Sequence, residues 1–162
     1  MKNKKSRLFI SAINIVLALF ISQSSMAQMK PADGSLISIS KYSYSETVDI
    51  LKGAIEEQNL MVIHEVDAQK MLRMAGKQVD GMSQIFYFHP KYMKRVIEAN
   101  PAATIQIPLK FIVMQRPDKK VVIRYFKPST TLNKYKGEES ISAELDGLVE
   151  KILAEVTNWD NS

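Results

Sequence analysis

The first 27 residues constrain the fold most, because their pattern is typical of a segment that is removed before folding. Four basic residues come first, and residues 8–21 follow as an apolar run with only two polar interruptions. Ser25 and Ala27 then place small side chains at the −3 and −1 positions of a cleavage site. This order of basic, apolar and small residues predicts a secretory signal peptide over residues 1–27.

A membrane anchor is the alternative interpretation of the same apolar run. Fourteen helical residues would extend about 21 Å, which is shorter than the ~30 Å hydrocarbon core of a bilayer. We therefore expect cleavage after Ala27 and no stable membrane span in the mature protein. The expected location is the periplasm, or the extracellular space if the host has no outer membrane.

The mature chain has the size of one domain. Removing 27 of the 162 residues leaves 135, and a chain of this length buries about two-thirds of its unfolded surface. We therefore expect a single domain over residues 28–162. The sequence contains no Cys, so this domain is expected to be stable without disulfides, and thiol catalysis and cysteine zinc sites are excluded.

The basic residues do not indicate a nucleic-acid-binding protein. Four of the 22 Lys and Arg residues lie in the predicted signal peptide, which leaves 18 against 17 Asp and Glu residues. Binding to nucleic acid needs a larger basic surplus. The charge is uneven, however: residues 91–136 hold 11 basic and two acidic residues, and residues 138–162 hold one basic and seven acidic residues. These segments either neutralise each other or provide a basic face for an anionic ligand.

The apolar periodicity predicts an alternation of strands and helices. Strands are expected at residues 36–39, 60–66, 84–88, 109–115 and 120–126, and helices at residues 45–58, 67–75, 90–100 and 141–156. The last helix is the clearest element, since its apolar residues keep helical spacing over four turns. This order indicates an α+β fold, in which helices pack mostly on one face of a sheet.

Particular residues are expected to set the ends of the helices. Ser45 is a candidate N-cap for the first helix, and Asn59 can adopt the left-handed conformation at its end. Asp67 is the expected N-cap of the second helix, and Pro90 suits the first position of the third.

The last two strands are expected to form a hairpin that turns at residues 116–119, with Arg116 opposite Lys119. In this register one face carries Lys110, Ile112, Met114, Val121, Ile123 and Tyr125, and the other carries Leu109, Phe111, Val113, Val122, Arg124 and Phe126. Each face would then be apolar with a single cation. A sheet with one face in water should instead alternate apolar and polar side chains along each strand. We therefore expect the second face to be covered by an ordered loop, a partner subunit or a bound apolar molecule.

Several short sequences and single prolines lie at the boundaries of these elements. They are Glu46-Thr47-Val48, Glu65-Val66-Asp67, Phe88-His89-Pro90, Pro108 and Pro128. From about Ser38 to Glu155, this order resembles the Domain of Unknown Function 302 family. The resemblance implies an α+β fold of the TATA-box-binding-protein-like type, an antiparallel sheet backed by helices. It implies no established activity.

The chain also departs from the pattern of that family. Phe88-His89-Pro90 stands where members often have cysteine-asparagine-proline, and Leu109 stands where they often have cysteine. A thiol-dependent role of relatives is therefore not transferred to this chain.

The two histidines are the main candidates for chemistry. His64 shares a strand face with Val62 and Val66 in the expected alternation, which favours a core histidine over a ligand or base. His89 precedes Pro90 at the start of a helix, where its ring can accept a hydrogen bond from a free backbone N–H. If protonated, the same ring can bind an anion near the positive helix end.

A metal site is not expected. Two histidines without cysteine do not form a typical zinc site. Methionines suit copper(I), but Met71, Met93 and Met114 lie in apolar stripes, and packing in the core explains them more simply. We expect no cofactor and no catalytic residue.

The sequence therefore favours a binding module over an enzyme. The expected partner is an apolar or amphiphilic small ligand, which can be anionic, or a second copy of the chain in a homodimer. The candidate ligand-binding residues are Arg124, Phe111, Val122, Phe126, Lys110 and His89. The alternative function is a small periplasmic enzyme or metal-binding protein that uses His64 or His89.

The signal-peptide prediction can be checked directly. The small residues at Ser25 and Ala27 favour cleavage after Ala27, so the exported protein should begin at Gln28. Amino-terminal sequencing of the exported protein measures this, and a mature chain that still carries residues 1–21 would contradict it.

Overall fold

A computed structural model of the chain describes residues 31–157, so the predicted signal peptide lies outside the described residues. Its centre is a five-stranded antiparallel sheet in the order β1-β5-β4-β3-β2. The strands are β1 (Leu36–Ile39), β2 (Met61–Asp67), β3 (Gly81–Phe88), β4 (Leu109–Gln115) and β5 (Val121–Tyr125). The expected α+β fold, an antiparallel sheet backed by helices, is confirmed.

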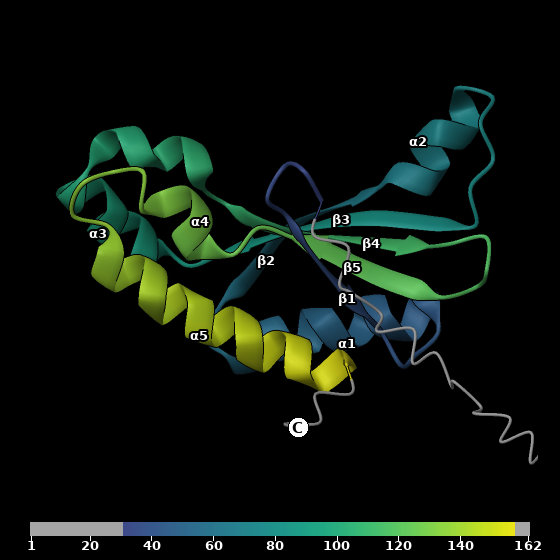
Figure 1. Ribbon diagram of the computed structural model, residues 1–162. Coiled ribbons are helices and arrows are strands. Elements are labelled where there is room, and N and C mark those ends of the chain that lie inside the picture. The colour runs from purple at the N-terminus through teal and green to yellow at the C-terminus, as the bar shows by residue number, and fades with distance from the viewer. Residues whose placement is uncertain (1–30, 158–162) are drawn as a thin grey trace, which may run out of the picture.

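Two long helices lie side by side on one face of this sheet (Figure 1). They are α1 (Tyr44–Glu57) and α5 (Glu139–Val156). The short helix α2 (Ala68–Met74) projects from one end of the sheet, and α3 (Pro90–Ala99), η1 (Pro101–Gln106) and α4 (Pro128–Leu132) gather at the other end. Within residues 31–157, no helix combines the length and the apolar character needed to cross a membrane.

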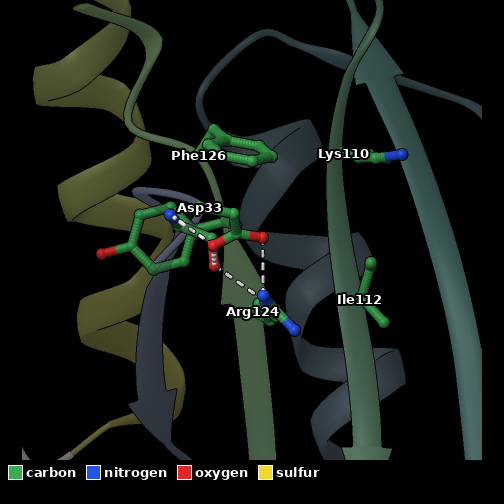
Figure 2. Close-up of a pocket in the computed structure, with 7 residues that line it drawn as sticks. Asp33, Lys110, Ile112, Arg124 and Phe126 are labelled. Atoms are coloured by element: carbon green, nitrogen blue, oxygen red, sulfur yellow. Dashed lines mark hydrogen bonds and ion pairs between the residues drawn. The ribbon is translucent and has the colours of Figure 1, made fainter. Parts of the chain in front are cut away.

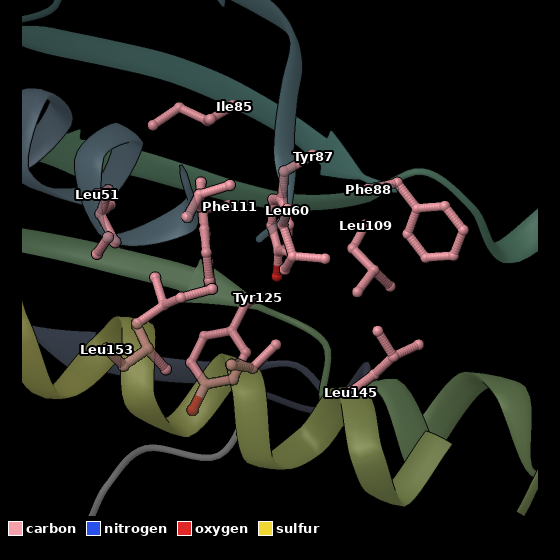
Figure 3. Packing of buried hydrophobic residues seen from close by; sticks show 14 of the residues in the cluster. Leu51, Leu60, Ile85, Tyr87, Phe88, Leu109, Phe111, Tyr125, Leu145 and Leu153 are labelled. Carbon is pink, nitrogen blue, oxygen red and sulfur yellow. The ribbon is translucent and has the colours of Figure 1, made fainter. Parts of the chain in front are cut away.

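The core lies between the sheet and the helices α1 and α5. Burial alternates along β3 and β4, because every second side chain points toward the helices. The rings of Tyr87 and Phe111 stack with their centroids 4.7 Å apart, and Tyr125 meets Phe111 edge-on at 5.8 Å. Leu145 and Leu153 of α5 close the core from the helix side (Figure 3). Each such buried side chain contributes about 1.5–3 kcal/mol to folding.

The first helix begins earlier than expected. Its N-cap is Ser43 and not Ser45. The carboxylate of Glu46 accepts hydrogen bonds from the Ser43 backbone N–H at 3.1 Å and from its hydroxyl at 2.6 Å, and both bonds lower the pKa of Glu46. The spacing of Ser43 and Glu46 is that of a capping box. This spacing favours Ser43 over Ser45 as the N-cap.

The end of α1, the cap of α2 and the start of α3 follow the sequence prediction, whereas α5 begins two residues earlier than expected and η1 and α4 were not predicted. Asp67 caps α2 by accepting a hydrogen bond from the Lys70 N–H at 2.8 Å. Asn59 takes the left-handed conformation after α1, with φ of 54°, and Pro90 is the first residue of α3.

The predicted register of the hairpin is wrong by one residue. Gln115 pairs with Val121, so the loop contains five residues, and the Arg116 N–H donates to the Lys120 carbonyl at 2.8 Å. Lys119 has a φ of 66°, which inserts one left-handed residue after the turn. This added residue moves every side chain of β5 to the opposite face relative to β4.

The prediction that His64 belongs to the core is also wrong. The register of β2 against β3 shifts between Val62, which pairs with Tyr87, and His64, which pairs with Phe86. Ile63 is the extra residue of this bulge and is 54% exposed. Because the bulge interrupts the alternation, Val62 points toward the helices, and His64 is exposed on the opposite face.

Core packing explains none of the three methionines, contrary to expectation, because Met114 lies half-buried on the sheet face opposite α1 and α5 and the other two lie on short helices. Met71 is 60% exposed on α2, and Met93 is 40% exposed on α3. Both belong to helices at the ends of the sheet, where only part of an apolar stripe can reach the core. Tyr92 and Val96 of α3 do reach it, as expected.

The oppositely charged segments partly neutralise each other. Arg95 of α3 donates to Glu144 of α5 at 2.6 Å, and Lys127 lies 3.1 Å from Glu150. The hydroxyl of Tyr92 donates to the same Glu144 at 2.6 Å, and burial raises the pKa of Tyr92 to about 12.

We predict that Gly81→Ala destabilises the protein by about 1–3 kcal/mol. An added Cβ would lie 2.8 Å from the ring of Tyr44, which cannot move freely because its hydroxyl donates to Ser83 at 2.8 Å. Chemical denaturation measures the effect. The matched control is Gly147→Ala in α5, where no atom lies within 4 Å of the new Cβ and the helix should gain up to ~1 kcal/mol. Equal stabilities of the two variants would contradict this packing.

One buried carboxylate has no partner in the described part of the chain. Glu138 precedes α5 and is fully buried, and neither of its side-chain oxygens has a hydrogen-bond partner there. Burial raises the pKa of Glu138, and the charge of Glu139 raises it further. The folded state therefore favours the protonated form, and ionisation above this pKa opposes folding.

We predict that Glu138→Gln stabilises the protein relative to the wild type at pH 7.5, because the amide cannot ionise in the folded state. The folded pKa lies above the unfolded one, so wild-type stability should fall as the pH rises through the range between the two, and the variant should lose this part of the pH dependence. Denaturation at pH 4 and pH 7.5 measures both effects. Glu139→Gln, at an exposed neighbour, is the control and should change little. If the stability of the wild type relative to Glu138→Gln rises from pH 4 to pH 7.5, the assignment is contradicted.

Candidate functional site

The strand side chains that point away from α1 and α5 form a second face of the sheet, which we call the open face. Its members follow from the strand register and from the alternation of side chains. They are Ile37, Ile39, Val122, Arg124, Lys110, Ile112, Met114, Met82, Gln84, Phe86, His64 and Val66. The open face is therefore largely apolar, with basic side chains in its middle and at one edge.

The corrected register brings the two predicted cations to the same face. Arg124 pairs with Ile112, and Lys110 lies one diagonal step away on β4. A shallow pocket of about 240 Å³ joins them (Figure 2). Its lining residues are Asp33, Ser35, Lys110, Ile112, Arg124, Tyr125 and Phe126.

The turn before β1 supplies an acidic partner for Arg124. The Asp33 carboxylate accepts a hydrogen bond from Nη2 of Arg124 at 2.6 Å, and the Ser35 hydroxyl accepts one from Nε at 2.8 Å. Ser35 in turn donates to Asp33 through its hydroxyl at 2.8 Å and its backbone N–H at 3.0 Å. Gly34 has a φ of 79°, which permits the tight turn between them.

These contacts favour the ionised form of Asp33. The bonds from Ser35 lower the pKa of Asp33, and the charge of Arg124 lowers it further. Nη1 of Arg124 has no hydrogen-bond partner among residues 31–157, so the pair fixes the guanidinium while leaving donors available to a ligand. Arg124 is 35% exposed at its side chain, so these donors are accessible to a molecule from solvent.

Lys110 lies between this pocket and a second, larger hollow. It is exposed, and within the described residues it has no acidic partner; its Nζ lies 5.8 Å from the ring centroid of Phe86. The second hollow has a volume of about 360 Å³. It is lined by Phe86, Ile105, Gln106, Ile107, Pro108, Leu109, Lys110, Phe126 and Thr131. Lys110 and Phe126 line both hollows, so the two adjoin.

The structure separates the predicted ligand-binding residues into three groups. Arg124, Lys110 and Phe126 surround the first pocket, and Val122 lies beside them on the open face but is only 4% exposed. Phe111 is fully buried on the face that the helices cover. The register error explains why Phe111 and Arg124 were assigned to one face.

His89 lies outside both pockets. Its Nδ1 accepts a hydrogen bond from the Lys91 N–H at 3.1 Å, so the ring caps α3, in agreement with its structural interpretation. Within residues 31–157, neither His89 nor His64 is hydrogen-bonded to a carboxylate. The same part of the chain has no group of three or more His, Asp or Glu residues that could hold a metal ion.

Sequence reasoning missed Asp33 and Ser35. They lie in the polar segment before β1, which showed no apolar periodicity. The sequence Asp33-Gly34 is typical of a turn, and a turn directly before an edge strand can place a carboxylate against the neighbouring strand. That signal was present, but the partner of Asp33 is 91 positions away in the sequence.

Comparisons with known proteins agree on the family and the fold. The family model described as Domain of unknown function DUF302 matches residues 37–157, which is most of the chain, so the chain belongs to this family. A crystal structure of an uncharacterized conserved DUF302 protein from Bacillus stearothermophilus is similar, with a TM-score of 0.69 and 17% identity. The match covers 75% of this chain and 97% of that one. The search of curated proteins gave no match.

Proposed function

We propose that this DUF302 protein is a binding module for an anionic amphiphile, which it holds on the open face of its sheet. The observation that carries the proposal is the position of Lys110 and Arg124 on neighbouring strands of that face, at one pocket and among apolar side chains. An anionic head with an apolar body matches both features at once, because each part would meet a complementary surface.

The head group would bind between the two cations. Lys110 contributes a charge without an acidic partner among the described residues, and Arg124 contributes the donors of Nη1. Asp33 stays bonded to Nη2, which keeps the guanidinium in place when the ligand is absent. Ile112 and Phe126 lie beside the charges and would contact the first carbons of the ligand (Figure 2).

We also propose that the protein acts after export, in the periplasm or outside the cell. The support is the basic, apolar and small-residue order of residues 1–27. The absence of Cys does not oppose this location, since packing between the sheet and its helices provides a continuous core.

We predict that the protein binds decanoate at least tenfold more tightly than decan-1-ol or decyltrimethylammonium, since only decanoate has a head that attracts the two cations. Lys110→Met should weaken decanoate binding roughly tenfold, because a charge-assisted contact is lost. Arg124→Met should weaken it more, because the Asp33 carboxylate would then remain unpaired beside the head group. Isothermal titration calorimetry measures the affinity of the wild type for the three ligands and the affinity of each variant for decanoate.

The matched control is Lys151→Met, which removes an exposed lysine of α5 on the other side of the sheet and should leave decanoate binding unchanged. Thermal unfolding checks that each variant is folded. Equal affinities for decanoate and decan-1-ol would contradict the proposed role of the cations, and so would a Lys110→Met variant that binds like the wild type.

A further inference from the structure

We infer that the ligand of the open face carries an alkyl chain, and that this chain occupies the second hollow, which we call the tail groove. The inference rests on the proposed function and adds the chemical class of the ligand. The tail groove is lined by Phe86, Ile105, Gln106, Ile107, Pro108, Leu109, Lys110, Phe126 and Thr131.

The walls of the tail groove come from three parts of the fold. The end of the sheet contributes Phe86 and Phe126, η1 and its connection to β4 contribute Ile105 and Ile107, and α4 contributes Thr131. Ile105 is 79% exposed and Phe126 is 39% exposed, although both are large apolar side chains. A chain lying between them would remove apolar surface that now faces solvent, and this burial would favour binding.

Apart from Lys110, which the tail groove shares with the first pocket, the polar side chains of the groove are already hydrogen-bonded within the protein. The amide nitrogen of Gln106 donates to the Tyr135 hydroxyl at 3.1 Å, and the Thr131 hydroxyl donates to the Pro128 carbonyl at 3.1 Å. An occupant therefore meets mainly apolar contacts and gains little from polar groups of its own. A sugar, a nucleotide or a peptide would lose hydrogen bonds to water here, whereas an alkyl chain would lose none.

The position of Lys110 fixes the direction of the ligand. Lys110 and Phe126 line both the tail groove and the pocket that contains Arg124. A head group at the cations can therefore continue directly past Phe126 into the tail groove. This continuity favours one molecule with an anionic end and an alkyl end over two separate ligands.

We predict that affinity rises with chain length in a series of straight-chain carboxylates from butanoate to decanoate. Each methylene that enters the tail groove should tighten binding by about fourfold. Thr131→Phe fills the groove, so its affinities should become nearly independent of chain length. Titration calorimetry below the micellar concentration measures the series, with NMR titration for the shortest members.

The matched control is Thr130→Phe, which adds the same ring to α4 at an exposed position outside both hollows and should keep the dependence on chain length. If Thr131→Phe does not fold, Ile105→Ser provides a second variant at a mostly exposed position and should reduce the same dependence.

The outcomes separate the two proposals. If no carboxylate of any length binds, the proposed function is wrong. If carboxylates bind but affinity is the same from butanoate to decanoate, the head-group site stands and the tail groove is wrong. If Thr131→Phe changes the number of chains in the assembly but leaves the chain-length dependence of carboxylate binding unchanged, the groove belongs to an interface with a second copy. The inference is then overturned.

Discussion

The backbone conformation of Lys119 decides which side chains of the last two strands face the helices and which lie on the open face. Its φ of 66° adds one residue to the hairpin loop and sets the pairing of Gln115 with Val121. A residue other than glycine adopts this conformation at a cost of roughly 1–2 kcal/mol. The Lys119 ammonium lies 2.6 Å from the Asp80 carboxylate, but this pair is mostly exposed and stabilises the loop only slightly. The main compensation is the core itself, because a slip of one residue would expose Ile123 and bury Arg124.

Among the described residues, helices α1 and α5 cover one face of the sheet, which explains how a small domain can be stable while its other face carries no helix. The helices α1 and α5 bury the aromatic and aliphatic side chains of one face, so the domain does not need the other face for its core. The ion pair of Asp33 and Arg124 is 35–50% exposed, and such pairs contribute about 0–1 kcal/mol to stability. Its larger effect is geometric, since together with Ser35 it fixes the direction of the guanidinium.

The success of the sequence prediction depended on how local each feature is. The strands, most helices and the caps at Asp67 and Pro90 follow from spacing over a few residues, and the structure agrees with them. The hairpin register depends on the left-handed conformation of Lys119, and the face of His64 depends on the bulge at Ile63. Lysine and isoleucine are not residue types that predict a left-handed conformation or a bulge. The site combines a turn before β1 with a side chain of β5, and nothing in a single sequence links residues that far apart.

The requirements of folding do not account for the residues of the open face. A related structure with 17% identity keeps the fold, in line with the tolerance of cores for apolar residues of similar total volume. Lys110, by contrast, is exposed beside Phe86 and lines two hollows with Phe126, and it contributes no side chain to the core. Likewise, the Arg124 side chain lies outside the core, and its contacts are the Asp33 carboxylate and the Ser35 hydroxyl. The arrangement of these two basic groups at one pocket and at the end of an apolar groove is the feature that the proposed binding function accounts for.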